Sequence, residues 1–589
     1  MLATFLAFLA FAPHRQPCTV TVSPGDSLHS AASSLSARGG IVCLSPGIHW
    51  LGGQPLRPAA GAPIVWRSAN ADPRSAAIIS GGMPLSHWQP CPSGAAACPS
   101  GVEGVWMHPM TGIDASMLPV RQLWVDGIRA SRRSVAGPSL NLTWPHQGFR
   151  FNGAAPPWLA DAAADQVELR WPSMIKNWIE PRCIVTSVNV SSRTMLLDAD
   201  CYSNLEQRIP GHARPRPPAF FENVAGELAP GEFYATMTTL YYRTNGTALT
   251  EPPRGAVVPV QELLLNASGA DGHTFEGLGF AHSTYRQPAQ RGGYVTTQST
   301  VLETPCPPRG CEPVGAVAVA AARNLSFVNC TFAHLGGTYA LSIGNASQGV
   351  LVRGCTFTDL SGGAIKLANV LDTARAETLN DSRVWDADYL IERNVVAGAA
   401  LEWRGAAAIF VGYVARLTLQ HNTVTQVGYT GISLGWGWGA VMSFARDNHV
   451  LRNRLSGVMR ALNDGGCIYT LGPQPGSSVE GNFCSLDEAP VVGCFYHDNG
   501  SRYFRTINNV ADASPAHAPC VYLQGCCGSP ALDIAVSELF CRDVGAAQNG
   551  CAAENCTIDQ ATLHVVNGAW PPQAQAIIAA AGADAAPPS

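Results

Sequence analysis

The chain has 589 residues, of which 13% are charged, and its formal net charge is −5. Its 59 glycines and 43 prolines indicate many turns and few long amphipathic helices. A protein that follows nucleic-acid phosphates normally carries a basic patch. This sequence has no basic run, so we exclude nucleic-acid binding. After the N-terminal twelve residues, no stretch of the sequence reaches the roughly 18 uninterrupted apolar residues of a membrane span.

The first twelve residues are almost entirely apolar and end in a small-x-small pattern at Ala10–Ala12. This pattern indicates that residues 1–17 form a signal peptide. A buried N-terminal strand is the alternative, because no positive charge precedes the apolar stretch. The 19 cysteines and ten Asn-x-Ser/Thr sequons favour a secretory route, so we expect a secreted or luminal glycoprotein with disulfide bonds.

Residues 18–117 are expected to form an N-terminal cap and the first coils of a solenoid. Pro24–Ala31 predicts a short capping helix, and Gly39–His49 predicts the first coil. From residue 118 to residue 260 the pattern changes to alternating runs such as Gln122–Gly127 and Thr239–Tyr242. Such runs indicate an inserted antiparallel β-rich module.

Internal repeats dominate residues 261–570, where Asn329–Gly337 recurs as Gly354–Gly363 at a period of 25 residues. An asparagine then closes a short apolar strand repeatedly, at Asn394, Asn422, Asn453, Asn482 and Asn509. The strands are too short for a sandwich, and no helical pattern separates them. We therefore predict an all-β protein, a right-handed parallel β-helix in which the repeated asparagines bond between coils.

Cysteines also recur at like positions, Cys330 with Cys355 and Cys467 with Cys494 and Cys520. Each is interpreted either as a small core residue or as half of a disulfide between neighbouring coils. No pair has the spacing and histidine partners of a structural zinc site, so we expect no metal. The alanine-rich tail, residues 571–589, predicts a short terminal helix.

Three motifs on successive coils carry the candidate chemistry: residues 429–438, 463–472 and 494–501. Together they predict one surface patch with two carboxylates, Asp464 and Asp498, as catalytic residues. The expected substrate-binding residues are Trp436, Trp438, Tyr469, Tyr496 and His497. Glycoside hydrolysis uses this combination, because one carboxyl group protonates the leaving oxygen, another acts as nucleophile or base, and aromatic faces stack on sugars.

Two observations argue against a catalytic role of Asp464 and Asp498. Asp464 precedes Gly-Gly and Asp498 precedes Asn-Gly, and both are ordinary turn sequences. If Cys467 and Cys494 are in register, the offset between the acids exceeds roughly 20 Å in an extended chain. Either glycine turns fold both side chains over one cleft, or that register is wrong. Otherwise the partner is another acid, such as Asp487 or Glu488.

The chain resembles the β-helix glycoside hydrolases of family 141, which include α-L-fucosidases and xylanases. Besides the three motifs, the resemblance rests on Arg121–Ala130, Glu222-Asn223, Pro230–Tyr234 and Leu240–Tyr242. It implies that Asp464 and Asp498 form the catalytic pair and that the inserted module is sandwich-like. The chain departs from the family at Asn499, where an acidic residue commonly stands, and Asn499 also begins a sequon.

Two rival functions remain. A β-helix polysaccharide lyase or epimerase would need a calcium-binding acidic cluster and a basic residue, but Lys176 and Lys366 both lie outside the aromatic motifs. A glycan-binding protein would need the aromatic residues without both acids. Gly435–Trp438 lacks the strand-to-helix context of a dinucleotide loop, so we expect no cofactor. The expected partner is a plant or algal cell-wall type polysaccharide.

Overall fold

The computed structural model describes residues 16–584, except 59–60, 71–75, 95–102, 137–141, 144–146, 152–155, 165, 172–177, 209–219, 246–250, 295–297, 303–311, 488–491, 514–517, 527 and 543–546. The predicted signal peptide lies outside the described residues apart from its last two positions. Among the described helices, none has the length and apolar character needed to cross a membrane.

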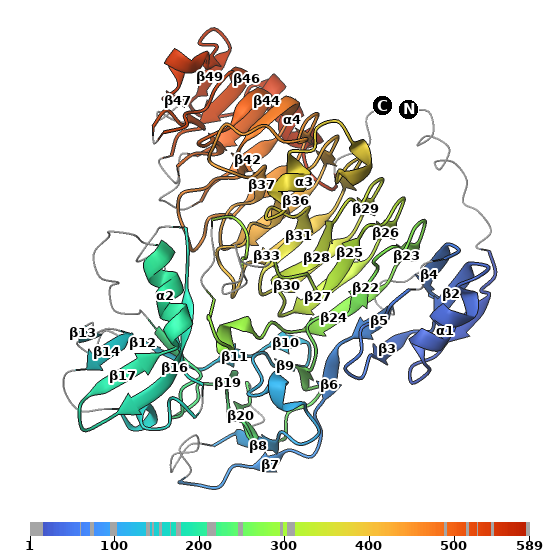
Figure 1. The fold of residues 1–589 in the computed structure, drawn as a ribbon, viewed down its shortest axis with the longest axis vertical. Helices are drawn as coiled ribbons and strands as arrows, with labels where there is room; N and C mark the ends of the chain where they lie inside the picture. Colours follow the sequence, from blue (N-terminus) through green and yellow to red (C-terminus); the bar gives the residue numbers. More distant parts are fainter. Residues whose placement is uncertain are drawn as a thin grey trace.

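The main body is a parallel β-helix whose coils stack along three parallel ladders (Figure 1). The first ladder contains β1 (Val20–Val22), β2 (Gly40–Leu44), β4 (Ile64–Ser68), β23 (Thr274–Glu276), β26 (Ser326–Val328), β29 (Leu351–Arg353), β32 (Leu390–Glu392), β35 (Thr418–Gln420), β38 (His449–Leu451), β41 (Pro473–Glu480), β44 (Arg502–Asp512), β46 (Ala535–Arg542) and β48 (Thr557–Ile558). The second contains β3 (Gly47–Trp50), β5 (Ala77–Ser80), β24 (Gly279–Ser283), β27 (Thr331–Leu335), β30 (Thr356–Leu360), β33 (Val395–Ala399), β36 (Thr423–Val427), β39 (Arg454–Ser456), β42 (Phe483–Ser485) and β49 (Leu563–Val566). The third contains β22 (Leu265–Asn266), β25 (Val317–Ala320), β28 (Tyr339–Gly344), β31 (Gly363–Leu367), β34 (Ile409–Val411), β37 (Ile432–Leu434), β40 (Ile468–Thr470), β43 (Phe495–His497), β45 (Val521–Leu523) and β47 (Ala547–Asn549).

The predicted asparagine column is present inside the turn between the first and second ladders. From Asn394 to Asn509, each side-chain amide donates to the amide oxygen of the next asparagine at 2.9–3.1 Å. Cys355 stands one coil before Asn394 in the same column, and its backbone N–H donates to the Asn394 amide oxygen. Buried polar groups are thereby satisfied from coil to coil, which supports a dry interior.

The sequence allows the recurring cysteines to be either small core residues or halves of disulfides between coils, and the structure distinguishes these interpretations. Cys330, Cys355, Cys494 and Cys520 are free and buried, so they act as small core residues. Cys467 instead bonds to Cys484 within its own coil. Other described disulfides join Cys18 to Cys43, Cys183 to Cys201 and Cys551 to Cys556. Several disulfides indicate an oxidising compartment.

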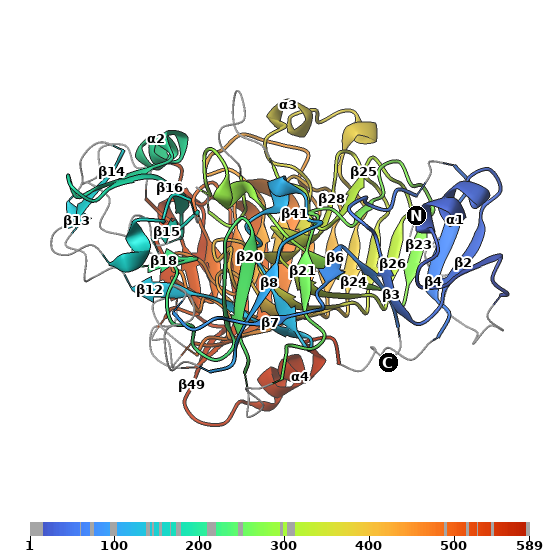
Figure 2. The same cartoon turned by 90° about the horizontal axis from the view of Figure 1, so that it is seen from below.

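Short helices lie at both ends. A capping helix is present as predicted, but it is α1 (Leu28–Leu35) rather than Pro24–Ala31, and it buries Leu28, Ala31, Ala32 and Leu35. α4 (Pro572–Ala580) confirms the predicted terminal helix, but it packs along the side of the solenoid near β44 (Figure 2). A further short helix, α3 (Thr373–Ala376), lies in the turn between β31 and β32.

The inserted module consists of small, mostly antiparallel sheets beside the solenoid (Figure 1). The four-stranded sheet contains β6 (Gly82–Pro84), β9 (Trp124–Val125), β10 (Ile128–Arg129) and β21 (Val257–Pro259). The five-stranded sheet contains β7 (Gln89–Pro90), β8 (Val105–Pro109), β11 (Ser131–Arg132), β19 (Glu232–Ala235) and β20 (Thr239–Arg243). The seven-stranded sheet contains β12 (Ser134–Ala136), β13 (Leu142–Thr143), β14 (Gly148–Phe151), β15 (Glu168–Arg170), β16 (Arg182–Asn189), β17 (Thr194–Leu197) and β18 (Phe220–Glu222), and α2 (Ala199–Arg208) packs on β16.

The fold class is therefore confirmed: the chain is mostly β, with a parallel solenoid and an antiparallel insertion. The antiparallel strands already begin with β6 at Gly82, upstream of the expected boundary at residue 118. Part of the module also has a hydrophobic core of its own, around Leu169 and Trp171.

Candidate active site

The third ladder places the tyrosines of two motifs side by side. β40 and β43 pair in parallel, with Tyr469 opposite Tyr496, and Tyr522 of β45 follows in the same column. These rings meet edge to face, with centroids 5.1 Å and 5.4 Å apart. Because side chains alternate along a strand, the column lies on the outer face of the ladder.

The structure brings Asp464 and Asp498 together. The Tyr496 hydroxyl lies 3.5 Å from Oδ1 of Asp464 and 2.8 Å from Oδ1 of Asp498. The sum of these distances is an upper limit on the separation of the two oxygens, so the carboxyl groups lie no farther apart than the roughly 5–9.5 Å found in glycosidases. β40 and β43 pair from Ile468 and Phe495 onward, so Cys467 and Cys494 are also in register.

The sequence suggested that Asp464 and Asp498 lie far apart along an extended chain. A sharp glycine turn after Asp464 brings them close instead. Asp464 has a left-handed backbone with φ of 64°. A Cβ atom on Gly465 would lie 2.3 Å from the Thr430 hydroxyl oxygen, and one on Gly466 would lie 2.3 Å from the Gly493 carbonyl oxygen. Only glycine allows this close approach, so Asp464 is both a turn former and a neighbour of Asp498.

The backbone of Asp464 is fixed by two side chains that sequence reasoning did not select. The Tyr429 hydroxyl donates to the Asp464 carbonyl at 2.6 Å, and the Gln298 amide donates to the same oxygen at 2.7 Å. Tyr429 opens the first motif and could have been selected from it. Gln298 lies 166 residues upstream and carries no local signal.

Asp498 is 5% exposed and accepts hydrogen bonds from the hydroxyls of both Tyr469 and Tyr496. The indole of Trp438 donates to the Tyr469 hydroxyl at 3.1 Å, and the Gln524 amide donates to that of Tyr496 at 3.4 Å. Burial, followed by the charge of Asp498, raises the pKa of both tyrosines. Their phenols therefore remain protonated donors at neutral pH.

The two tryptophans form the partly exposed border of the site. Trp436 and Trp438 meet edge to face at 5.1 Å, and Trp436 also packs against Phe410. A Cβ atom on Gly500 would lie 2.4 Å from the Gly439 carbonyl oxygen. The turn after Asp498 therefore presses directly against the loop that carries both tryptophans.

The structure does not bring His497 into this group. Its ring points into the coil, where its nitrogens bond to the hydroxyls of Thr470 and Thr506 at 2.8 Å each. Burial lowers the pKa of His497 to about 3. Asn499 is also buried, and its amide donates to the Cys526 carbonyl at 2.6 Å.

The alternative groups lie elsewhere. Asp487 is exposed on its turn, and Glu488 and Lys176 fall outside the described residues. Lys366 is buried and bonds to Glu312 at 2.5 Å. It stands three strands before Tyr469 in the third ladder, roughly 14 Å away at the usual strand spacing. The one described lysine is therefore remote from the acid pair.

Comparison with known proteins finds no matching family model and no matching curated protein. Among solved structures, one described as a glycoside hydrolase is 22% identical, with a TM-score of 0.66, and the match covers 89% of this chain and 91% of that one. A second, a complex of XylC with xylose, is 11% identical with a TM-score of 0.49, covering 88% of this chain and 72% of the other. The first similarity shows that this chain shares the fold of a glycoside hydrolase.

Proposed function

We propose that the protein is a secreted glycoside hydrolase with Asp464 and Asp498 as its carboxyl pair. The observation that carries this proposal is the Tyr496 hydroxyl, which is within hydrogen-bonding reach of both carboxylates. Turn formation alone explains each aspartate separately. It gives no reason for two acids from different coils to share one phenol.

We assign Asp498 as the nucleophile, because hydrogen bonds from two phenols hold its carboxylate oxygens in a fixed position. Asp464 is less buried and is assigned as the acid that protonates the leaving glycosidic oxygen. The carboxylate of Asp498 then attacks the anomeric carbon and forms a glycosyl ester. Water, deprotonated by Asp464, releases the sugar, and these two successive displacements retain the anomeric configuration.

The substrate is proposed to be a plant or algal cell-wall type polysaccharide, with fucosidase-like or xylanase-like specificity as the family resemblance implies. Trp436 and Trp438 are partly exposed beside Asp498 and offer flat faces to a sugar ring. Tyr469 and Tyr496 are buried, so their role is to hold the carboxylates rather than to stack on substrate.

The test is release of reducing sugar from a panel of plant and algal polysaccharides, aryl α-L-fucoside and aryl β-xyloside. We expect Asp464→Ala and Asp498→Ala to abolish release and to keep the fold by circular dichroism. Asp487→Ala, at an exposed acid, is the matched control and should retain activity. Binding without hydrolysis across the panel would instead identify a glycan-binding protein.

A further inference from the structure

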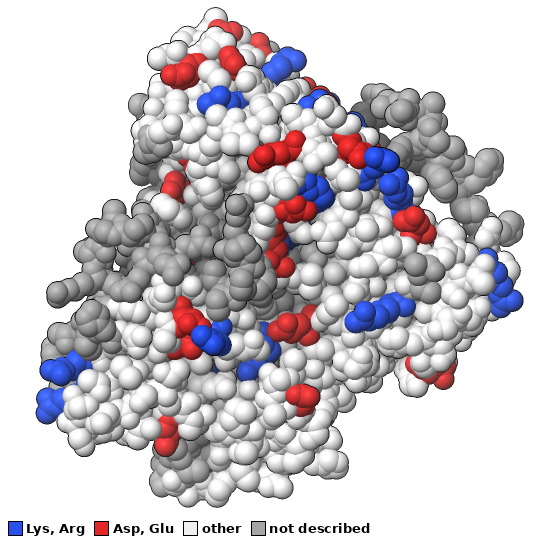
Figure 3. Space-filling view, in the orientation of Figure 1, with Lys and Arg blue, Asp and Glu red and all other residues white. Residues whose placement is uncertain are grey.

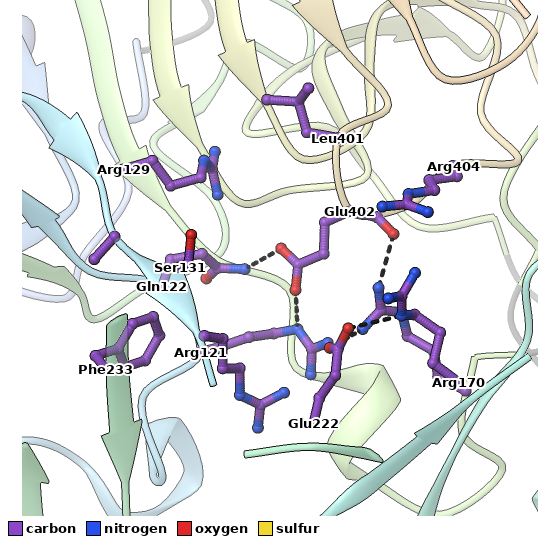
Figure 4. Close-up of a pocket in the computed structure, with 13 residues that line it drawn as sticks. Arg121, Gln122, Arg129, Ser131, Arg170, Glu222, Phe233, Leu401, Glu402 and Arg404 are labelled. Atoms are coloured by element: carbon purple, nitrogen blue, oxygen red, sulfur yellow. Dashed lines mark hydrogen bonds and ion pairs between the residues drawn. The ribbon is translucent and has the colours of Figure 1, made fainter. Parts of the chain in front are cut away.

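A cavity lies where the inserted module meets the solenoid. It has a volume of about 210 Å³, and Leu401 and Arg404 stand partly exposed at its mouth. Figure 4 shows Glu402 inside it, bonded to Arg121 and Gln122. In Figure 3, basic and acidic side chains meet on the surface at this junction. We call this cavity the arginine pocket; its arginines are Arg121, Arg129, Arg132, Arg170, Arg182 and Arg404.

The charges around the pocket do not balance. Two lining residues are acidic, Glu222 and Glu402. The arginines reach three further carboxylates behind the walls, at Glu168, Glu180 and Asp359. Among the described residues, six guanidinium groups thus face five carboxylates, which leaves one positive charge in excess in a partly buried site.

The pKa shifts of the surrounding groups show that guanidinium and carboxylate charges coexist around the pocket. Burial opposes the charged form of Glu402, yet the charges of Arg121 and Arg182 lower the pKa of its carboxyl group. Burial lowers the pKa of Arg132 despite the nearby carboxylates. Burial and the charges of Arg121 and Arg132 also lower the pKa of Arg286, beside the pocket, to about 10. The one unbalanced guanidinium charge is therefore the feature that would attract an anion.

The pocket and the acid pair lie along the same row of turns. Glu402 belongs to the turn before β34 and Asp464 to the turn before β40, with the turn before β37 between them. Backbone hydrogen bonds join these turns, from Ala408 to Thr430 and from Gly431 to Gly466. The two coil steps correspond to roughly 10 Å along the axis of the solenoid.

We propose that the arginine pocket binds an anionic sugar residue, whose negative group is a carboxylate or a sulfate ester, as a subsite for the glycan cleaved at Asp464 and Asp498. This rests on the proposed function, because the pocket and the acid pair belong to the same row of turns, two coils apart. Guanidinium groups suit both anions, since they offer paired donors in a fixed plane. The excess charge supplies the attraction, and the cavity size fits one monosaccharide.

The experiment is calorimetric titration of the Asp498→Asn protein, which keeps the pocket intact while preventing turnover. The ligands are galacturonic acid, glucuronic acid and galactose 6-sulfate, with galactose and glucose as neutral counterparts. Arg404→Gln changes the partly exposed arginine at the mouth, which the structure bonds to Glu180. Arg416→Gln is the matched control, because Arg416 is similarly exposed and pairs with Asp388 outside the pocket.

We expect an acidic sugar to bind at least about tenfold more tightly than its neutral counterpart. Arg404→Gln should weaken that binding about fivefold, and Arg416→Gln should leave it unchanged. Preference for the uronic acids or for the sulfated sugar identifies the anion. Equal affinity for acidic and neutral sugars, or equal effects of both variants, would overturn the proposal.

The experiments distinguish failure of the pocket proposal from failure of the hydrolase proposal. Acid-sugar binding that depends on Arg404, without hydrolysis of any polysaccharide, would remove the hydrolase and keep the pocket. Hydrolysis that proceeds equally on a pectic polysaccharide and its carboxyl-reduced form, with no effect of Arg404→Gln on KM, would remove the pocket and keep the hydrolase.

Discussion

The phenol of Tyr496 donates to the carboxylate of Asp498 at 2.8 Å, two residues further along the same chain segment. Tyr496→Phe removes this donor and the link to Asp464 while it keeps the ring. We expect kcat to fall about 100-fold, as for loss of a preorganised donor at a developing charge.

Tyr522→Phe is the control for that experiment. Tyr522 packs edge to face on Tyr496 from the next strand, but its hydroxyl bonds to Gln524 at 3.5 Å and contacts neither aspartate in the structure. Near-normal kcat is expected. Equal losses in both variants would mean that the column acts only through packing.

The two aspartates should differ in chemical rescue. Azide should restore activity to Asp498→Ala on an aryl glycoside and yield a glycosyl azide of inverted configuration, because the small anion occupies the space of the lost nucleophile. Asp464→Ala should retain activity best on substrates with good leaving groups, which need no protonation. Product analysis by NMR makes the distinction, and the reversed pattern would exchange the two roles.

Gly465→Ala should displace Asp464 without touching any carboxylate. The added methyl group would lie 2.3 Å from the Thr430 hydroxyl oxygen, so the turn must shift. We expect loss of activity and roughly 1–3 kcal/mol of destabilisation in urea unfolding. Gly439→Ala is the control, since a Cβ atom there meets nothing within 4 Å and should leave the free energy of unfolding unchanged.

Acid should destabilise the fold through His497. Its pKa is about 3 when folded, against about 6.5 in an unfolded chain, so between these values only the unfolded chain binds the proton. The free energy of unfolding should therefore fall as the pH drops from 6.5 towards 3, by up to about 1.4 kcal/mol per pH unit. His497→Gln should flatten this slope, and the exposed His87→Asn should not.

Asn499 should carry no glycan in the secreted protein. Its side-chain nitrogen, the atom that a glycan would occupy, is buried and donates to the Cys526 carbonyl at 2.6 Å. Peptide mapping by mass spectrometry would measure its occupancy. The half-buried Asn266 sequon serves as the comparison, and full occupancy at Asn499 would contradict the described geometry of the site.

The solenoid could be predicted because its buried asparagines need hydrogen-bond partners on neighbouring coils and therefore recur at the length of one coil. A buried asparagine such as Asn453 needs partners above and below, so its spacing reveals the coil length. The disulfide between Cys467 and Cys484 could not be predicted, since both lie within one coil and share no column. The module boundary was missed because β6 spans only Gly82–Pro84 and carries no alternating pattern.

For the candidate site, the motifs located both aspartates but not the contacts that hold them. Strand alternation alone would have separated His497 from Tyr496, because adjacent residues of a strand face opposite sides. Gln298 reaches the Asp464 carbonyl from a distant segment, and only the folded chain brings them together. The arginine pocket likewise combines residues of the module and the solenoid, such as Arg121 and Glu402.

The asparagine column gives successive coils the same hydrogen bond to their neighbours. Every amide from Asn394 to Asn482 donates in the same direction, so any two neighbours in the column present identical chemistry to each other. The segment from Asn394 to Asn422 carries neither aspartate of the acid pair, and its duplication would preserve the hydrogen bonds of the column. The number of coils before the acid pair can therefore change while the asparagine column stays continuous.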